Sequence, residues 1–167
     1  MNDKALALAK ALIRNFDEAE LVHEQRPPHY DTRCARLAKG TAARKLGASI
    51  DTVAPGMLSC PYHFHHAQEE MFVILDGRGT LRVAGELLPI KAGDVIFVPP
   101  GPEYPHQLIN TSDAALKYLS VSTREQPEIC EYPDSNKYLA HSMTSDGRYF
   151  EAIQRVENTL DYWDGEI

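Results

Sequence analysis

Between Leu46 and Ser122 the sequence alternates short apolar runs with turns that contain glycine or proline. The runs are rich in β-branched and aromatic residues and have lengths of about four to eight residues, which is typical of β-strands. The turns fall at Pro55-Gly56, Asp76-Gly77, Ala92 to Asp94 and Pro99 to Pro102. The pattern predicts strands over Leu46 to Val53, Met57 to Phe64, Met71 to Leu75, Thr80 to Val83, Leu87 to Ile90, Val95 to Val98, Gln107 to Asn110 and Leu116 to Ser122. No helical pattern separates them, so we expect an all-β barrel or jelly roll with a mouth for a small ligand.

Helical spacing is found at the N-terminus, before this region. Asn2 and Asp3 can cap a helix that continues to about Asn15, with Leu8, Leu12 and Phe16 on one stripe. After Ser122 the sequence predicts an extended arm, and residues 149–160 fit either a strand or a helix. We therefore expect an N-terminal helical segment over residues 1–29, a barrel over residues 30–125 and an extension over residues 126–167. The extension is expected to pack on the barrel or on a partner subunit.

Composition narrows the range of partners. The 167 residues fit one domain, and a net charge of −7 disfavours binding to nucleic acid or to anionic lipid. There is no apolar stretch of the ~18 to 20 residues that a membrane span needs and no signal-peptide pattern, so we expect a cytoplasmic protein. Cys34, Cys60 and Cys130 are far apart without CxxC spacing, which predicts free thiols.

The stretch from Pro61 to Gly77 carries the candidate chemistry. His63 and His65 are two residues apart, so in an extended backbone both imidazoles lie on the same face and can bind one ion. Glu70 follows, and the change of parity between His65 and Glu70 predicts a bulge or loop at His66 to Gln68. The histidines outside these motifs and Glu69 are less informative about function. His66 and Glu69 should face away from the cavity, and His23, His29 and His141 are expected at the surface.

The spacing from His63 through Glu70 to Gly77 resembles the first signature of the cupin superfamily. A second stretch, from Gly93 through Pro99 and Gly101 to His106 and Asn110, resembles the second signature. Four residues, Pro102 to Pro105, separate Gly101 from His106 where the family usually has two. The longer loop makes His106 the least secure of the implied ligands.

The resemblance implies a single cupin β-barrel of the double-stranded β-helix type, with His63, His65, Glu70 and His106 as ligands of a divalent transition metal. Three imidazoles and a carboxylate suit Zn, Fe, Mn, Ni or Co. Glu70 and Tyr104 are candidates for catalytic roles, although a packing role for Tyr104 remains open. Phe72 and Ile74 share the parity of Glu70, which predicts a mostly apolar pocket, and no arginine is placed by the sequence to meet an anionic substrate.

Two functions remain open at this stage. The first is a metal-dependent enzyme acting on a small organic molecule, as an oxygenase, isomerase or lyase. The second is a binding or sensing cupin with a structural metal and no turnover. The resemblance also implies a homodimer, because cupins commonly pair through barrel faces and N-terminal segments.

Overall fold

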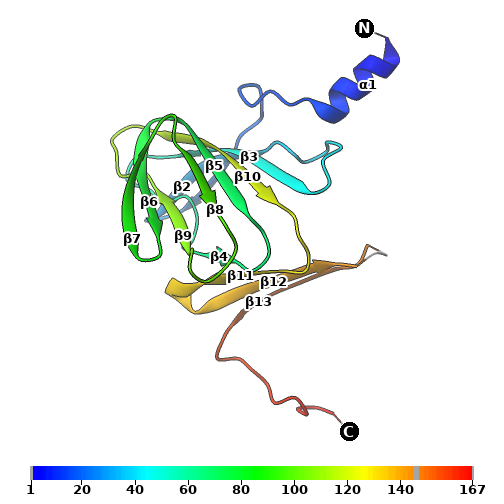
Figure 1. The fold of residues 1–167 in the computed structure, drawn as a ribbon, viewed down its shortest axis with the longest axis vertical. Coiled ribbons are helices and arrows are strands. Elements are labelled where there is room, and N and C mark those ends of the chain that lie inside the picture. Colours follow the sequence, from blue (N-terminus) through cyan, green and yellow to red (C-terminus); the bar gives the residue numbers. More distant parts are fainter. Residues whose placement is uncertain (1, 145–146, 167) are drawn as a thin grey trace.

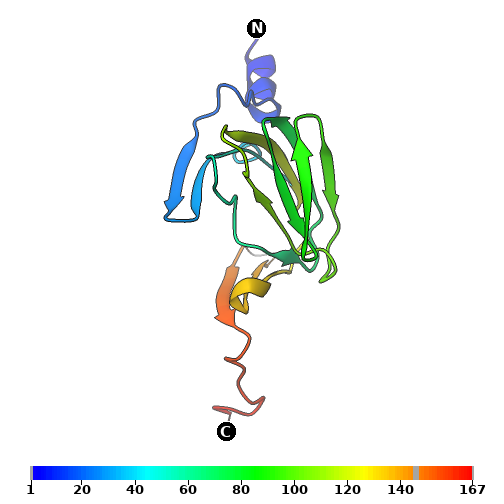
Figure 2. The ribbon, with the colours of Figure 1, turned by 90° about the vertical axis from the view of Figure 1, so that its left-hand side faces the viewer.

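Two facing sheets form a jelly-roll barrel in the computed structural model, which describes residues 2–144 and 147–166 (Figures 1 and 2). The larger sheet is antiparallel, with strands in the order β1 (Val22–Arg26), β2 (Tyr30–Arg36), β3 (Leu46–Val53), β10 (Leu116–Thr123), β5 (Glu70–Asp76) and β8 (Val95–Val98). The smaller sheet contains β7 (Glu86–Lys91), β6 (Arg78–Val83) and β9 (His106–Ile109). The predicted all-β barrel fold is therefore confirmed.

Side-chain packing, rather than one continuous hydrogen-bonded cylinder, holds the two sheets together. Both sheets contribute to a single apolar core, which consists of Val53, Phe72, Ile74, Leu81, Ile90, Val98, Leu108, Leu116 and Tyr118. Burial of this much apolar surface is the main favourable term in folding. The core occupies one end of the barrel, which leaves the other end for polar side chains.

A third sheet lies below the barrel in Figure 1 and is built mostly from the C-terminal extension. Its strands are β13 (Tyr149–Arg155), β12 (Lys137–Met143), β11 (Glu128–Tyr132) and β4 (Phe64–His65), and the short 3-10 helix η1 (Pro133–Ser135) lies between β11 and β12. Because β4 carries His65, this sheet attaches the extension directly to the candidate site. Residues 149–155 are thus a strand, which decides the alternative left open by the sequence.

Most predicted strands agree with the structure to within two residues, but the one over Met57 to Phe64 is wrong. Only Phe64 and His65 form a strand there, and Leu58 and His63 make isolated bridges. The backbone of this segment bonds to several different partners, including Leu108 and His106, so no continuous ladder forms. Strands β1, β2, β11 and β12 were not predicted, because β1 is polar and the other three mix polar and apolar residues without a clear alternation.

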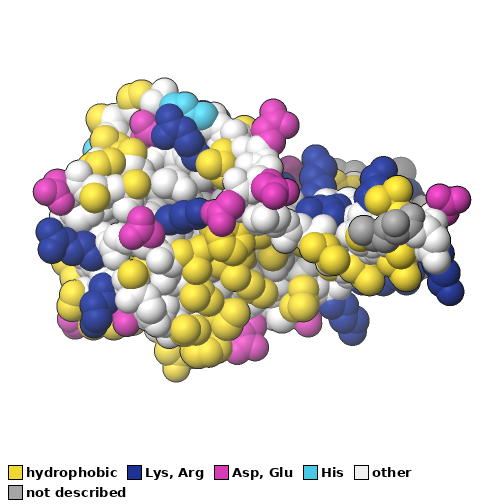
Figure 3. Space-filling model, turned by 90° about the horizontal axis from the view of Figure 1, so that it is seen from above, with side chains coloured by type: hydrophobic (Ala, Val, Ile, Leu, Met, Phe, Trp, Pro, Cys, Tyr) yellow, Lys and Arg dark blue, Asp and Glu magenta, His cyan; other side chains and the backbone are white. Residues whose placement is uncertain are grey.

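The N-terminal helix α1 (Asp3–Leu12) begins as expected, with the Asn2 side chain accepting a hydrogen bond from the Ala5 amide at 2.9 Å. It ends earlier than predicted and projects from the barrel (Figures 1 and 2). No residue of α1 is buried, and Leu8 and Leu12 are 49% and 64% exposed. When the molecule is viewed from above relative to Figure 1, hydrophobic side chains are visible between charged ones (Figure 3). In the described residues, no helix is long and apolar enough to cross a membrane.

Candidate metal centre

Strands β4, β5 and β9 bring the predicted ligands together at the polar end of the barrel. His65 lies in β4, Glu70 begins β5 and His106 begins β9. His63 precedes β4 and exchanges two backbone hydrogen bonds with His106, at 3.2 and 2.7 Å. The longer loop before His106 therefore has not carried this residue away, because the bridge to His63 fixes its position.

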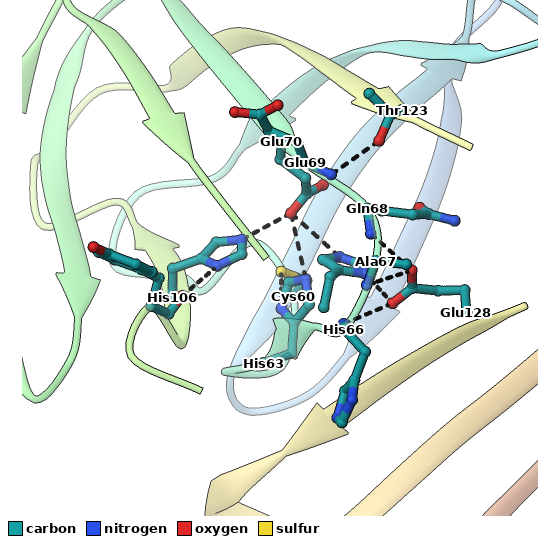
Figure 4. A network of polar contacts seen from close by, with 12 residues as sticks. Cys60, His63, His66, Ala67, Gln68, Glu69, Glu70, His106, Thr123 and Glu128 are labelled. Carbon is teal, nitrogen blue, oxygen red and sulfur yellow. Dashed lines mark hydrogen bonds and ion pairs between the residues drawn. The ribbon is translucent and has the colours of Figure 1, made fainter. Parts of the chain in front are cut away.

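The three imidazoles converge on one oxygen atom of Glu70. The distances to Glu70 Oε2 are 2.8 Å from His106 Nε2, 3.3 Å from His65 Nε2 and 3.8 Å from His63 Nε2. Figure 4 shows the Glu70 carboxylate pointing toward His63 and His106. Ligand atoms that each lie about 2.1 Å from a metal ion are about 3.0 to 3.4 Å apart, so these separations are those of a nearly assembled site.

The other nitrogen of each ring fixes its tautomer. His63 Nδ1 lies 2.8 Å from the Pro61 carbonyl oxygen, and His106 Nδ1 lies 3.1 Å from that of Tyr104. Because a carbonyl oxygen can only accept, both Nδ1 atoms must donate, which leaves both Nε2 atoms directed at Glu70. Such a nitrogen can donate a hydrogen bond to the carboxylate, as His106 does at 2.8 Å, or coordinate a cation once its proton has left. The donor set therefore fits a bound divalent transition metal.

Burial and charge set the protonation states at this site. Burial, followed by the charge of His106, lowers the pKa of His63 to about 4. Burial acts to raise the pKa of Glu70, but the hydrogen bonds from His106 and His65 outweigh it and hold that pKa well below its usual range. The pKa of His65 is raised, because Glu70 and Glu128 outweigh the effect of burial. A neutral His63 and an ionised Glu70 are the forms that coordinate metal.

Glu128 is a residue that the sequence analysis missed. It lies 63 positions from His65, is 1% exposed, and its Oε1 accepts a hydrogen bond from His65 Nδ1 at 3.3 Å. Its carboxylate also accepts from the backbone amides of His66, Ala67 and Gln68 at 3.0, 3.2 and 2.8 Å (Figure 4). The predicted loop at these positions thus wraps around a carboxylate that orients His65. No local signal marks Glu128, since it comes from a strand of the extension.

A cavity of about 210 Å³ opens beside His63, Glu70 and His106. Phe72 lines it as predicted, whereas Ile74 belongs to the core instead. The prediction of a mostly apolar pocket is wrong, because polar side chains of the large sheet and the Ser59 loop also line it: Ser49, Asp51, Ser59 and Ser120. Ser49 Oγ donates to Asp51 Oδ2 at 2.5 Å, and burial raises the pKa of Asp51. The cavity thus contains a carboxyl group that is separate from the candidate ligands.

Tyr104 contributes its backbone carbonyl to the site, as the acceptor for His106 Nδ1, and its side chain is 44% exposed. It is not among the residues that line the cavity, and its catalytic role stays a prediction. His66 faces away as expected, with Nε2 at 2.7 Å from Glu131 Oε1.

All three cysteines are free thiols. Cys130 offers a second grouping, because its sulfur lies within 4.8 Å of ligand atoms of His63 and His65. Burial raises the pKa of Cys130 to about 12, which disfavours the thiolate that a metal would bind.

Comparisons with known proteins agree with this geometry. A family model described as Cupin domain matches residues 49–122. A Cupin 2 conserved barrel domain protein from Salinispora arenicola is 30% identical with a TM-score of 0.53, and the alignment covers 66% of this chain and 86% of that one. A sugar phosphate isomerase from Silicibacter pomeroyi has a TM-score of 0.72 at 23% identity, covering 90% of this chain and 96% of that one. The chain belongs to the cupin superfamily.

Two curated relatives match shorter stretches. An uncharacterised protein of Methanocaldococcus jannaschii is 37% identical over 73 residues, which are 41% of this chain and 57% of that protein. An oxalate-binding protein of Thermotoga maritima is 39% identical over 59 residues, which are 35% of this chain and 47% of that protein. The chain thus spans about half the length of the curated relatives it matches.

Proposed function

We propose that this cupin is a metal-dependent enzyme that acts on a small organic molecule, with His63, His65, Glu70 and His106 as metal ligands. The observation that carries the proposal is the convergence of three Nε2 atoms on Glu70 Oε2, at 2.8 to 3.8 Å. Two of the three rings have Nδ1 held by a carbonyl oxygen and the third by Glu128, so in each ring Nε2 is the nitrogen that can bind a metal when it carries no proton. Arrangements of this kind, with the second ring nitrogen held by an acceptor, are the rule for metal-binding histidines.

A bound ion at this position would act as a Lewis acid toward a substrate oxygen or lower the pKa of a bound water. Four protein ligands leave further coordination positions for an ion that prefers five or six. The substrate would bind in the cavity beside these ligands, and Asp51 offers a carboxyl group there for proton transfer. Its raised pKa suits that task, because a general acid or base works best with a pKa near the operating pH. These features support oxygenase, isomerase or lyase chemistry.

A second candidate function is small-molecule binding without turnover. It is favoured by the match to the Thermotoga maritima protein that is named as oxalate-binding. Identification of the native metal and of any co-purifying molecule separates the two functions. Conversion of that molecule into a product supports the enzyme, whereas tight binding with no product after prolonged incubation supports the binding protein.

Metal content of purified variants tests the ligand assignment. We expect near-stoichiometric transition metal in the unmodified protein, a sharp loss of affinity in His63→Ala, His65→Ala and His106→Ala, and a smaller loss in Glu70→Gln, which keeps an oxygen donor. His66→Ala is the matched control, because its ring pairs with Glu131 at the surface.

The cysteine variants test the other grouping. Replacement of Cys34, Cys60 and Cys130 by Ser should leave metal content unchanged. Loss of metal in Cys130→Ser alone would replace the His63, Glu70 and His106 group by the one that contains sulfur. Absence of metal from the unmodified protein, even after growth with added metal, would refute the enzymatic proposal.

The assembly of the protein is also a proposal. A homodimer in which α1 packs against a second copy is supported by the exposed apolar stripe of that helix. The cytoplasmic location and the division at residues 29/30 and 125/126 remain predictions.

A further inference from the structure

A second hollow, of about 450 Å³, continues from the metal cavity toward the C-terminal extension. Ser49 and Ser120 line both spaces, so the two are neighbours that share a wall. The remaining lining comes from the large sheet, from the loops at Gln68 and Gln126, and from β12 and β13. The extension thus closes one side of this hollow, which we call the arginine pocket after Arg36 and Arg124.

Strand register explains why the arginine pocket lies next to the candidate ligands. On the inner face of the large sheet, Glu70 pairs with Ser122, and Ser122 pairs with Gly47 on the next strand. One row further into the barrel, Ser120 pairs with Ser49, which in turn pairs with Arg36 on β2. Cross-strand neighbours are about 5 Å apart, so the serine hydroxyl groups and the Arg36 guanidinium group occupy the sheet positions next to the candidate metal site.

The two guanidinium groups have no carboxylate partner. Within residues 2–144 and 147–166, the side chains of Arg36 and Arg124 make no ion pair within 4 Å and donate no hydrogen bond. The acids around them already have donors: Glu70 from the imidazoles, Glu128 from backbone amides and Asp51 from Ser49. The charge of Arg36 acts on Asp51 from a distance, but neither guanidinium group forms an ion pair within 4 Å with a carboxylate of the described residues.

A third polar group in the arginine pocket also lacks a partner. His141 Nδ1 is fully buried and has no hydrogen-bond partner among the described residues. The sequence predicted His141 at the surface, whereas the residue is half-buried. A buried polar atom without a partner costs about 1 to 3 kcal/mol, so the ring gains stability from any rearrangement that gives this nitrogen a partner.

The glycine at position 47 gives Arg124 its place. A Cβ atom there would lie 2.7 Å from Ser122 Oγ and 3.3 Å from Arg124 Nε, so the missing side chain lets the guanidinium lie over the inner face of β3. The backbone conformation of Gly47 does not require glycine, because its φ is in the ordinary range. The need for glycine at this position thus comes from space beside Arg124 and Ser122.

From these observations we propose that the arginine pocket binds a phosphate group, and that the substrate is a small phosphorylated organic molecule whose remaining part occupies the metal cavity. Two guanidinium groups match the charge of about −1.5 to −2 that a phosphate monoester carries at pH 7, and the hydroxyls of Ser120 and Ser122 can donate to its third oxygen. The assignment of the molecule as a substrate rests on the proposed function, whereas the binding of phosphate does not.

Titration calorimetry with inorganic phosphate and with glycerol phosphate tests the proposal on the full chain. We expect one site per chain in the unmodified protein and about 10- to 100-fold weaker binding in Arg36→Gln and Arg124→Gln, since each removes charge-assisted hydrogen bonds. Gly47→Ala keeps both charges but displaces Arg124, so it should also weaken binding. Arg33→Gln is the matched control, because it removes the same charge from an exposed position of β2 that lines no part of the pocket. Circular dichroism and metal content are measured on every variant.

The outcomes separate this inference from the proposed function. Weaker phosphate binding in both arginine variants with unchanged metal content, and less than a twofold change in Arg33→Gln, supports the pocket. An equal loss in Arg33→Gln overturns it, because the effect is then one of overall charge. Metal-loaded protein that binds no phosphate also overturns it, while the metal assignment stands. Tighter binding of malonate than of phosphate overturns the choice of phosphate. Phosphate binding to protein that never takes up metal supports the pocket and refutes the proposed function.

Discussion

Replacement of Glu128 by Gln should weaken both the fold and the proposed metal site, although His65 is the only proposed ligand to which Glu128 is hydrogen-bonded among the described residues. The carboxylate receives four donors, two on each oxygen: His65 Nδ1 and the His66 amide on Oε1, and the Ala67 and Gln68 amides on Oε2. An amide keeps one oxygen and turns the other into a donor. Whichever way it is oriented, two buried donors then face an NH₂ group.

The structure gives the size of the effect. Each buried donor that loses its acceptor costs about 1 to 3 kcal/mol, so the two together should lower the free energy of unfolding by about 2 to 6 kcal/mol. Loss of the acceptor for His65 Nδ1 also frees the ring to rotate and to change tautomer, and changes of this kind lower metal affinity about 10- to 100-fold. The site should therefore bind metal more weakly even where the variant remains folded.

Urea unfolding followed by circular dichroism measures the first effect, and calorimetric metal titration measures the second. Glu131→Gln is the matched control: it lies three residues away on the same strand and its partner His66 is at the surface, where an ion pair contributes about 0 to 1 kcal/mol. Equal stability and equal metal affinity in the two variants would refute the idea that Glu128 organises the loop and orients His65.

Three further predictions concern pH, a turn and the assembly. In the metal-free protein, the pKa of His63 is about 4 when folded and about 6.5 when unfolded, so the unfolded state binds the proton first as the pH falls. The free energy of unfolding should therefore decrease from pH 6.5 to pH 4, by up to about 3 kcal/mol from this residue. Urea unfolding measures this decrease, and a flat pH profile would contradict it. Gly77→Ala should destabilise more than Gly85→Ala, since both glycines have a φ of 83° but only at Gly77 would a Cβ meet a backbone carbonyl; equal midpoints in urea would show that the contact is relieved at no cost. Replacing Leu8 and Leu12 of α1 by Glu should turn the proposed dimer into a monomer in sedimentation velocity, and a monomeric unmodified protein at micromolar concentration would remove the dimer.

The sequence alone was sufficient for the parts of this protein that depend on local patterns. Apolar runs and turn residues predicted β3, β5, β6, β7, β8, β9 and β10, because each of these strands is a short, mostly apolar segment bounded by residues typical of turns. The spacing of His63, His65 and Glu70 predicted that they meet, since it depends on an extended pair of histidines and one short loop between His65 and Glu70. For the same reason the asparagine cap of α1 was predicted, because capping depends on neighbouring residues. The sequence could not decide what the apolar stripe of α1 packs against, because burial depends on the rest of the fold.

Only the tertiary structure decided which distant residues complete the site. Glu128 reaches His65 because β11 pairs with β4, and Arg36 reaches the inner face beside Ser49 because β2 pairs with β3. The strands β2 and β11 mix polar and apolar residues without a clear periodic pattern, so neither their existence nor their register is visible in the sequence. Register across a sheet is set by the packing of the whole barrel, and a shift of one residue would point each of these side chains to the opposite face. The choice of candidate ligands was therefore local information, whereas their orientation and the charge of the neighbouring pocket depended on the fold.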